Sequence, residues 1–139
     1  MAVEVDIEYE GNLLCRAVHG PSRAALVTDA PLDNGGTASA FSPTDLVAVA
    51  TGTCILTIMG LAAQRLGIDL SGTRIKIIKE MVSDPVRRIG ALTATITLPT
   101  GLDLTEADRT RLEHAAKVCP VKQSLHPDVR IDLSFAYPK

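Results

Sequence analysis

The sequence predicts an α+β fold in which strands come before and after one long helix. Three observations support this class. Residues 3–10 alternate between apolar and acidic side chains, the run 46–63 contains no charged residue, and residues 129–137 alternate again. A period of two indicates a strand with two different faces, whereas a long uncharged run indicates a buried helix. At 139 residues the chain is long enough for one hydrophobic core, so we expect a single domain, 1–139.

The N-terminal part, residues 1–41, is expected to form an antiparallel β-meander. In the first strand, residues 3–10, the odd-numbered positions are apolar and form the face that we expect to be buried, while the even-numbered positions are acidic. Gly11-Asn12 favours positive φ and predicts a hairpin turn. Two further short strands are expected at 13–18 and 25–28. The turn-rich segment 30–41 predicts a surface loop.

A central helix is predicted over residues 42–67. Ser42 has the properties of an N-cap, Pro43 suits the first helical position, and Asp45 supplies an acid at the third. Gly67 is the expected C-terminal stop.

The uncharged run 46–63 is long enough to cross a membrane. We reject that interpretation because threonines and glycines make the run only mildly hydrophobic and no other segment resembles a span. A helix that is apolar on every face is expected to be buried on every face, at the centre of a core. Ala48, Gly52 and Gly60 should allow a neighbouring backbone to approach closely.

The C-terminal part, residues 72–139, is expected to contain a β-hairpin, a helix and a last strand. The hairpin strands are predicted at 73–82 and 91–98, and the last strand at 129–137. Thr105, with Asp108 three residues later, predicts the start of an amphipathic helix, and Pro120 should end it near Val118. The inward face of that helix is predicted to hold Leu112, Ala115 and Ala116.

The charge balance argues against a polyanionic partner. The chain has 14 basic and 16 acidic residues, a net charge of −2, and the basic residues form no stripe, so we expect no nucleic-acid partner. The first ten residues are acidic and strand-like rather than typical of a signal peptide. We therefore expect a reducing cytoplasm, where a cysteine pair is more often catalytic than structural.

The three cysteines occupy unlike settings. Cys54 lies in the uncharged helix, too far from its start for the helix dipole to lower the thiol pKa much, so a reactive Cys54 would need an activating Arg or His from outside the helix. The alternative is that Cys54 only packs as a small apolar residue. Cys119, followed by Pro120, fits the N-cap of a short helix, where the helix end and Lys122 would favour the thiolate. The alternative is a purely structural cysteine that marks the end of one helix and the start of the next. Cys15 lies in an apolar strand segment and is interpreted as structural.

The histidines and glycines carry no recognisable motif. His19, His114 and His126 match no familiar zinc spacing, and we expect each to be hydrogen-bonded or exposed. His19 and His126 flank loop prolines, and a further role for these two stays open. Gly35-Gly36 lacks the surroundings of a phosphate loop and is interpreted as a turn.

Two segments carry a family resemblance. Residues 41–46 (FSPTDL) leading to Gly52-Thr53-Cys54, followed at long range by Cys119-Pro120-Val121, resemble the osmotically inducible protein C family and its organic hydroperoxide resistance branch (OsmC/Ohr). The resemblance spans nearly the whole chain. It implies an OsmC-like fold, with antiparallel sheets around a long buried central helix, in an intertwined homodimer.

The resemblance also implies a function. Peroxidases of this family reduce alkyl or fatty-acid hydroperoxides, and by this likeness Cys54 would attack the peroxide and Cys119 would resolve the resulting sulfenic acid as a disulfide. A dithiol, such as a lipoylated protein, would reduce the disulfide. No metal, haem or flavin cofactor, no nucleic acid and no membrane is implied.

One departure from the family pattern affects this interpretation. Thr44 stands where studied members have a Glu that orients an activating Arg. Asp45 lies about 180° around the helix from Cys54 and is assigned to capping. Arg16 and Arg23 are candidates for the Arg, with Arg23 preferred because a loop reaches further than a strand.

Two hypotheses therefore stand. The first is a thiol peroxidase for organic hydroperoxides. The alternative is a dimer of the same fold that lacks this activity and binds a lipid-like small molecule or senses redox state. A cysteine hydrolase lacks support because no histidine stands near either cysteine in a recognisable motif.

Overall fold

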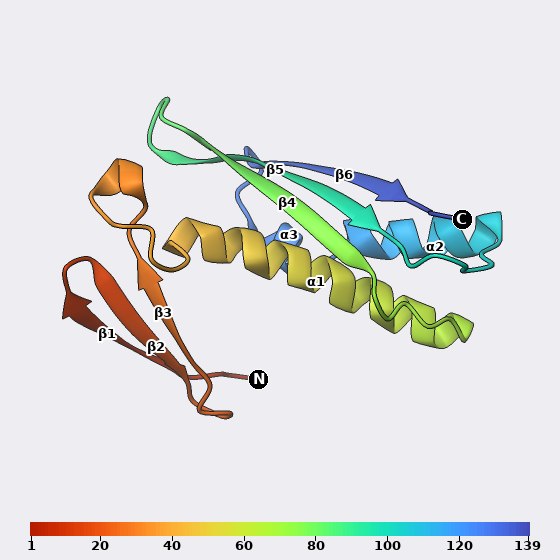
Figure 1. Ribbon diagram of the computed structural model, residues 1–139, viewed down its shortest axis with the longest axis horizontal. Coiled ribbons are helices and arrows are strands. Elements are labelled where there is room, and N and C mark those ends of the chain that lie inside the picture. Colours follow the sequence, from red (N-terminus) through yellow and green to blue (C-terminus); the bar gives the residue numbers. More distant parts are fainter. The chain divides into compact units, whose positions relative to one another are not determined.

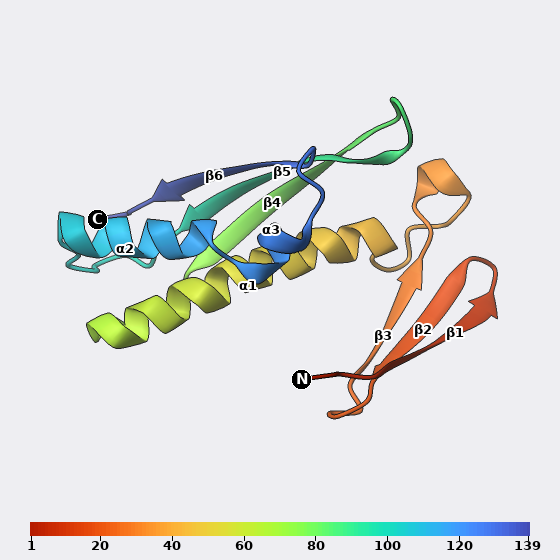
Figure 2. The ribbon, with the colours of Figure 1, turned by 180° about the vertical axis from the view of Figure 1, so that it is seen from behind.

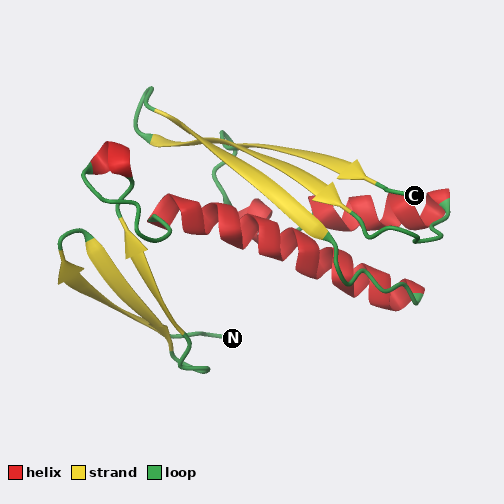
Figure 3. Cartoon of the chain, viewed as in Figure 1, coloured by secondary structure: helices red, strands yellow, loops and turns green.

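The computed structural model describes residues 1–139, and the chain divides into two compact units, Met1–Val47 and Ala48–Lys139. Figure 1 shows the elements of each unit in chain order, and Figure 2 shows the same ribbon from behind. Both units contain a three-stranded sheet, and the helices other than one 3-10 turn lie wholly or mostly in the second unit (Figure 3). The α+β class predicted from the sequence is confirmed.

The first unit is the predicted antiparallel meander. Strands β1 (Val5–Gly11), β2 (Leu14–His19) and β3 (Ala25–Asp29) lie in the order β1-β2-β3. The β1–β2 turn has positive φ at three successive residues, Gly11, Asn12 and Leu13, so the second strand begins one residue later than predicted.

The apolar row of β1 is not buried within this chain, contrary to our expectation. Val5, Ile7 and Tyr9 are 53%, 69% and 63% exposed. The alternation itself was predicted correctly, but a three-stranded sheet has no second layer of its own with which to cover that face. The row is a large exposed apolar surface, of the kind that marks an interaction site.

The loop after β3 is held by one buried carboxylate. Asp29 Oδ2 accepts hydrogen bonds from the backbone and hydroxyl groups of Thr37 (3.3 and 2.7 Å) and of Ser39 (3.0 and 2.8 Å). These donors favour the charged form and hold the pKa of Asp29 well below its usual range, with Ser39 N–H contributing most. The loop contains one 3-10 turn, η1 (Leu32–Asn34).

Helix α1 (Pro43–Leu66) begins and ends as predicted. Ser42 Oγ accepts from the N–H of Asp45 at 3.1 Å, and Asp45 Oδ2 accepts from the N–H of Ser42 at 2.9 Å, which forms a reciprocal cap. Gly67, at φ 70°, ends the helix in the left-handed conformation.

The sheet of the second unit is mixed, which corrects the expectation of antiparallel sheets only. Strands β4 (Arg74–Val82) and β5 (Arg88–Thr97) are antiparallel, whereas β6 (Arg130–Ala136) runs parallel to β5. The chain between β5 and β6 passes through α2 (Glu106–Lys117) and α3 (Pro120–Ser124). Such a helical crossover returns the chain to the same end of the sheet, and the next strand is then parallel.

The core of the second unit lies between its sheet and its helices. Its buried members come from α1, β5, α2 and the following segments: Ile55, Met59, Ala63, Ala94, Ile96, Leu98, Leu112, Ala116 and Cys119. The three residues predicted on the inward face of α2 are all buried.

The prediction that α1 is buried on every face is wrong for the single chain. Val49 and Leu61 are 38% and 48% exposed, and Gly60 has no neighbour where a side chain would project. Gly52 does face the sheet, but it meets the Ile75 side chain rather than a backbone. By length and hydropathy α1 could cross a membrane, yet one face of it packs into the core of the second unit, as expected of a core helix.

Candidate redox site

Cys119 occupies the N-cap position that its sequence predicted. Its Sγ accepts the N–H of Lys122 at 3.3 Å, and Pro120 is the first residue of α3. The short helix starts here because proline cannot continue α2 but suits a first helical turn.

The pKa of the Cys119 thiol is raised, which corrects the prediction that local features would favour its thiolate. The main cause is burial, since Cys119 is 0% exposed and the charged form loses its hydration. The N–H groups of Lys122 and Val121 act in the opposite direction but do not outweigh burial.

The fold brings Cys54 to Cys119. A hydrogen bond with Cys54, and repulsion from its charge, also raise the pKa of Cys119, so the two side chains interact directly. Both are free thiols, and Cys54 is half-buried and packs against the core that contains Cys119. Two cysteines 65 positions apart thus form one pair, between the middle of α1 and the start of α3.

The remaining cysteine belongs to the other unit. Cys15 lies in β2, opposite Tyr9 on β1 and Thr28 on β3. It is half-buried in the sheet, in agreement with a structural role.

Thr44 and Asp45 both belong to the start of α1. Thr44 Oγ1 lies 3.2 Å from Ser42 Oγ, and Asp45 completes the cap described above. The capping role predicted for Asp45 is confirmed. The neutral Thr44 cannot orient a guanidinium through a charge.

The two candidate arginines lie in the N-terminal unit. Arg16 is exposed on β2, and Arg23 is exposed in the β2–β3 turn at φ 61°, where its N–H donates to His19 O at 2.8 Å. Activation of Cys54 by either residue stays a prediction.

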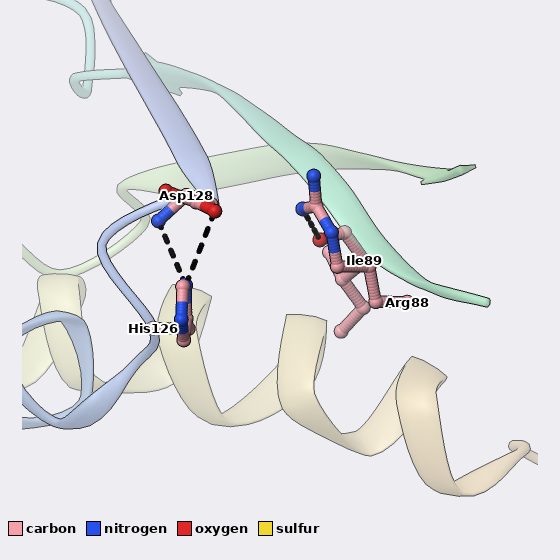
Figure 4. A network of polar contacts seen from close by, with 4 residues as sticks. All are labelled: Arg88, Ile89, His126 and Asp128. Atoms are coloured by element: carbon pink, nitrogen blue, oxygen red, sulfur yellow. Dashed lines mark hydrogen bonds and ion pairs between the residues drawn. The ribbon is translucent and has the colours of Figure 1, made fainter. Parts of the chain in front are cut away.

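The histidines at the turns have local partners. His19 Nδ1 shares a hydrogen bond with the Ser22 hydroxyl. His126 Nδ1 accepts the N–H of Asp128 at 3.0 Å and lies 3.8 Å from its carboxylate, while Arg88 Nη1 donates to the Ile89 carbonyl at 3.2 Å (Figure 4). These contacts order the loop before β6 and the start of β5.

A groove of about 730 Å³ between α1 and α2 contains two arginines that the sequence does not single out, together with His114. Arg65, Arg111 and His114 lie among its mainly apolar lining. The signal that could have found Arg65 is helical spacing, because it lies eleven residues after Cys54 and therefore on the same face of α1.

Together, the mixed sheet packed on a long helix and the two neighbouring cysteines define an α+β protein with a pair of free thiols in its second unit. The comparison with protein families identifies the lineage. Residues 36–134 match the model of the OsmC-like protein family, and the chain belongs to that family.

Solved structures agree with this assignment. A Psychrobacter arcticus 273-4 protein, classed with the osmotic stress induced and detoxification response, is 37% identical, with a TM-score of 0.88 over 94% of this chain and 93% of its own. An organic hydroperoxide resistance protein OsmC from Legionella pneumophila is 19% identical (TM-score 0.77, covering 98% of this chain and 97% of its own). The organic hydroperoxide resistance protein OhrB of Bacillus subtilis is 18% identical (TM-score 0.68, covering 97% and 98%). The last two show a common fold. A comparison with curated protein sequences finds no match.

Proposed function

We propose that the protein is a thiol peroxidase that reduces organic hydroperoxides through Cys54 and Cys119. The observation that carries the proposal is the direct interaction of two free thiols, one half-buried and one fully buried. Two structural relatives are named organic hydroperoxide resistance proteins, which supports a role in peroxide stress.

The first step oxidises Cys54. Its thiolate attacks the distal oxygen of the hydroperoxide, the O–O bond breaks, and the alkoxide leaves and takes a proton to become the alcohol. Cys54 becomes a sulfenic acid, two electrons more oxidised.

The second step closes the disulfide. Cys119 sulfur attacks the Cys54 sulfur, an S–S bond forms, and hydroxide leaves; the proton lost by Cys119 converts it to water. A dithiol such as a lipoyl group then supplies two electrons and two protons and restores both thiols.

The surroundings of the two thiols suit this order. A raised pKa keeps Cys119 protonated at neutral pH, so it does not compete as the nucleophile in the first step. Cys54 is the more exposed of the pair. Arg16 or Arg23 is our candidate for stabilising its thiolate.

The proposal includes a homodimer in a reducing cytoplasm. The exposed apolar row of β1 is a surface that a second copy would cover, and a reducing compartment would keep the thiols free between turnovers.

The test is titration of the reduced protein with cumene hydroperoxide, with free thiols counted and disulfide-linked peptides identified by mass spectrometry. Wild type and the matched control Cys15→Ser should both form the Cys54–Cys119 disulfide. Cys119→Ser should stop at a sulfenic acid on Cys54, and Cys54→Ser should not react. Retention of both thiols in the wild type, or equal reactivity of Cys54→Ser, would overturn the peroxidase proposal.

A further inference from the structure

We propose that the reduced pair of Cys54 and Cys119 is a binding site for trivalent arsenic that carries one organic substituent, with the arsenic held by both sulfurs at once. This site goes beyond the proposed function, because it needs two free thiols in contact and no peroxidase activity. Thiol sulfur is a soft ligand, and it prefers soft acceptors such as this metalloid.

The two sulfurs are close enough for a single atom to join them. Cys54 lies in the middle of α1 and Cys119 caps α3, and their side chains are in hydrogen-bond contact. Trivalent arsenic is pyramidal, so its two bonds to sulfur form a bent bridge between neighbouring sulfurs. A linear bridge, as in a two-coordinate mercury(II) bis-thiolate, needs sulfurs that stand further apart. The contact therefore favours the bent bridge.

The number of ligands at the pair also matches this acceptor. No group of three or more His, Cys, Asp and Glu side chains is arranged to hold a metal ion, so the pair offers two ligands only. Structural zinc uses four protein ligands. Trivalent arsenic with one organic substituent has two positions left for sulfur, and the pair fills both.

Burial of the pair selects for a product without charge. Cys119 is 0% exposed, and an anion at this position would lose its hydration. The bis-thiolate of an organic arsenic(III) group is neutral, whereas two thiolates joined by copper(I) carry a net negative charge. This difference favours the arsenical over copper(I).

The surroundings of Cys54 suit an apolar substituent on the arsenic. Cys54 is half-buried within the uncharged run 46–63, and Ala50 and Ile58 lie one helical turn away on either side of it. Both neighbours are half-buried apolar residues, so the substituent would cover a partly exposed apolar surface. Removing that surface from water adds to the affinity.

Binding is a double substitution that conserves charge and oxidation state. Phenylarsine oxide, present in water as phenylarsonous acid, carries two hydroxyl groups on its arsenic. Each thiol sulfur forms one As–S bond and displaces one hydroxyl, which leaves as water with the thiol proton. Two waters are released, arsenic stays trivalent and no electrons are transferred, so no oxidant or reductant is required.

Mass spectrometry of the reduced, native protein with phenylarsine oxide tests the site without any peroxide. Wild type and the matched control Cys15→Ser should bind one phenylarsenic group with release of two waters. Cys54→Ser and Cys119→Ala should bind through one sulfur, release one water and bind roughly 100-fold more weakly, since the second bond of a chelate forms within one molecule. Alanine at position 119 keeps a small apolar side chain in the core. Either single variant decides the point if the other does not fold.

Two further measurements identify chelation and selectivity. The wild-type complex should persist in 2-mercaptoethanol and dissociate in 2,3-dimercaptopropanol, because only the dithiol competes for both positions on arsenic. Inorganic arsenite should bind roughly tenfold more weakly than phenylarsine oxide, because a hydroxyl takes the place of its apolar group.

Four results would overturn the proposal: release of a single water by the wild type, binding in a folded single variant within tenfold of the wild type, equal dissociation by the two competitors, or arsenite binding as tight as that of phenylarsine oxide. The peroxidase is judged separately. Turnover of cumene hydroperoxide without arsenic binding would refute this site alone, and arsenic binding without turnover would refute the peroxidase alone.

Discussion

Replacing Cys54 with Ala should lower the pKa of Cys119 while leaving that residue buried. Burial is the main reason that the pKa is raised, and the hydrogen bond and charge of Cys54 add to it. Alanine removes both contributions of Cys54 but keeps most of the core packing around Cys119. The pKa should therefore fall in the variant through loss of the Cys54 contribution alone.

The expected rate of Cys119 alkylation at neutral pH follows from the pKa of its thiol in the wild type. An ordinary cysteine pKa of 9.0 is the reference from which Cys119 is raised. At two units or more below the pKa, fewer than about 1 in 100 thiols are ionised, and each unit changes that fraction about tenfold. Since the thiolate is the reactive form and Cys119 is 0% exposed, it should be alkylated at least roughly 100-fold more slowly than an exposed, ionised thiol.

Alkylation by iodoacetamide over a range of pH measures this directly. Trypsin would separate the three cysteines into peptides 1–16, 24–65 and 118–122, so mass spectrometry can follow each one independently. In the wild type, the half-maximal rate for Cys119 should lie above pH 9.0, and in Cys54→Ala it should move to lower pH. Faster labelling of Cys119 than of Cys54 in the wild type at neutral pH would refute the reasoning, as would an unchanged profile in the variant.

Three further predictions concern the fold. Leu112→Ala removes a side chain that is 0% exposed in the core and should lower the free energy of unfolding by about 3–5 kcal/mol in urea titrations; a loss below about 1 kcal/mol would contradict the packing. Thr105→Ala breaks the reciprocal cap of α2 with Asp108 and should cost about 1 kcal/mol, measured against Thr100→Ala, an exposed loop threonine, as control. Asp29→Asn should destabilise the protein at neutral pH, and the difference in urea midpoint between wild type and variant should shrink as pH falls below 3.8. The pKa of Asp29 is lower in the folded than in the unfolded state, so its carboxylate stabilises the fold at pH values above the unfolded-state pKa. That contribution is lost as the carboxylate of the folded protein takes up its proton. A difference that grows in acid would contradict this sign.

Features set by neighbouring residues could be predicted from the sequence. The caps at Ser42, Thr105 and Cys119 each depend on a residue and its partner three positions later, and all three are found where expected. Periodicity likewise located the strands and helices to within a few residues, because it reflects side-chain direction within one element.

Features set by tertiary contacts could not be predicted from the sequence. The direction of β6 depends on how the chain between β5 and β6 crosses the sheet. The exposure of Leu61 depends on how many structural layers pack around α1, and the local sequence pattern of a helix does not reveal that number. For Cys119, the helix donors were visible in the sequence, but the opposing burial comes from residues far along the chain, and burial is the larger effect.

That error about Cys119 bears on how the pair would work. Two easily ionised thiols in contact would repel each other as thiolates, and either could meet the peroxide first. Burial of Cys119 removes this ambiguity, because a protonated, inaccessible sulfur can react only with a partner already beside it. In the proposed mechanism the oxidised Cys54 would be that partner, and the hydroxide that leaves it would take the proton that Cys119 must lose. The two environments would then assign the two proposed steps in order, although both side chains are thiols.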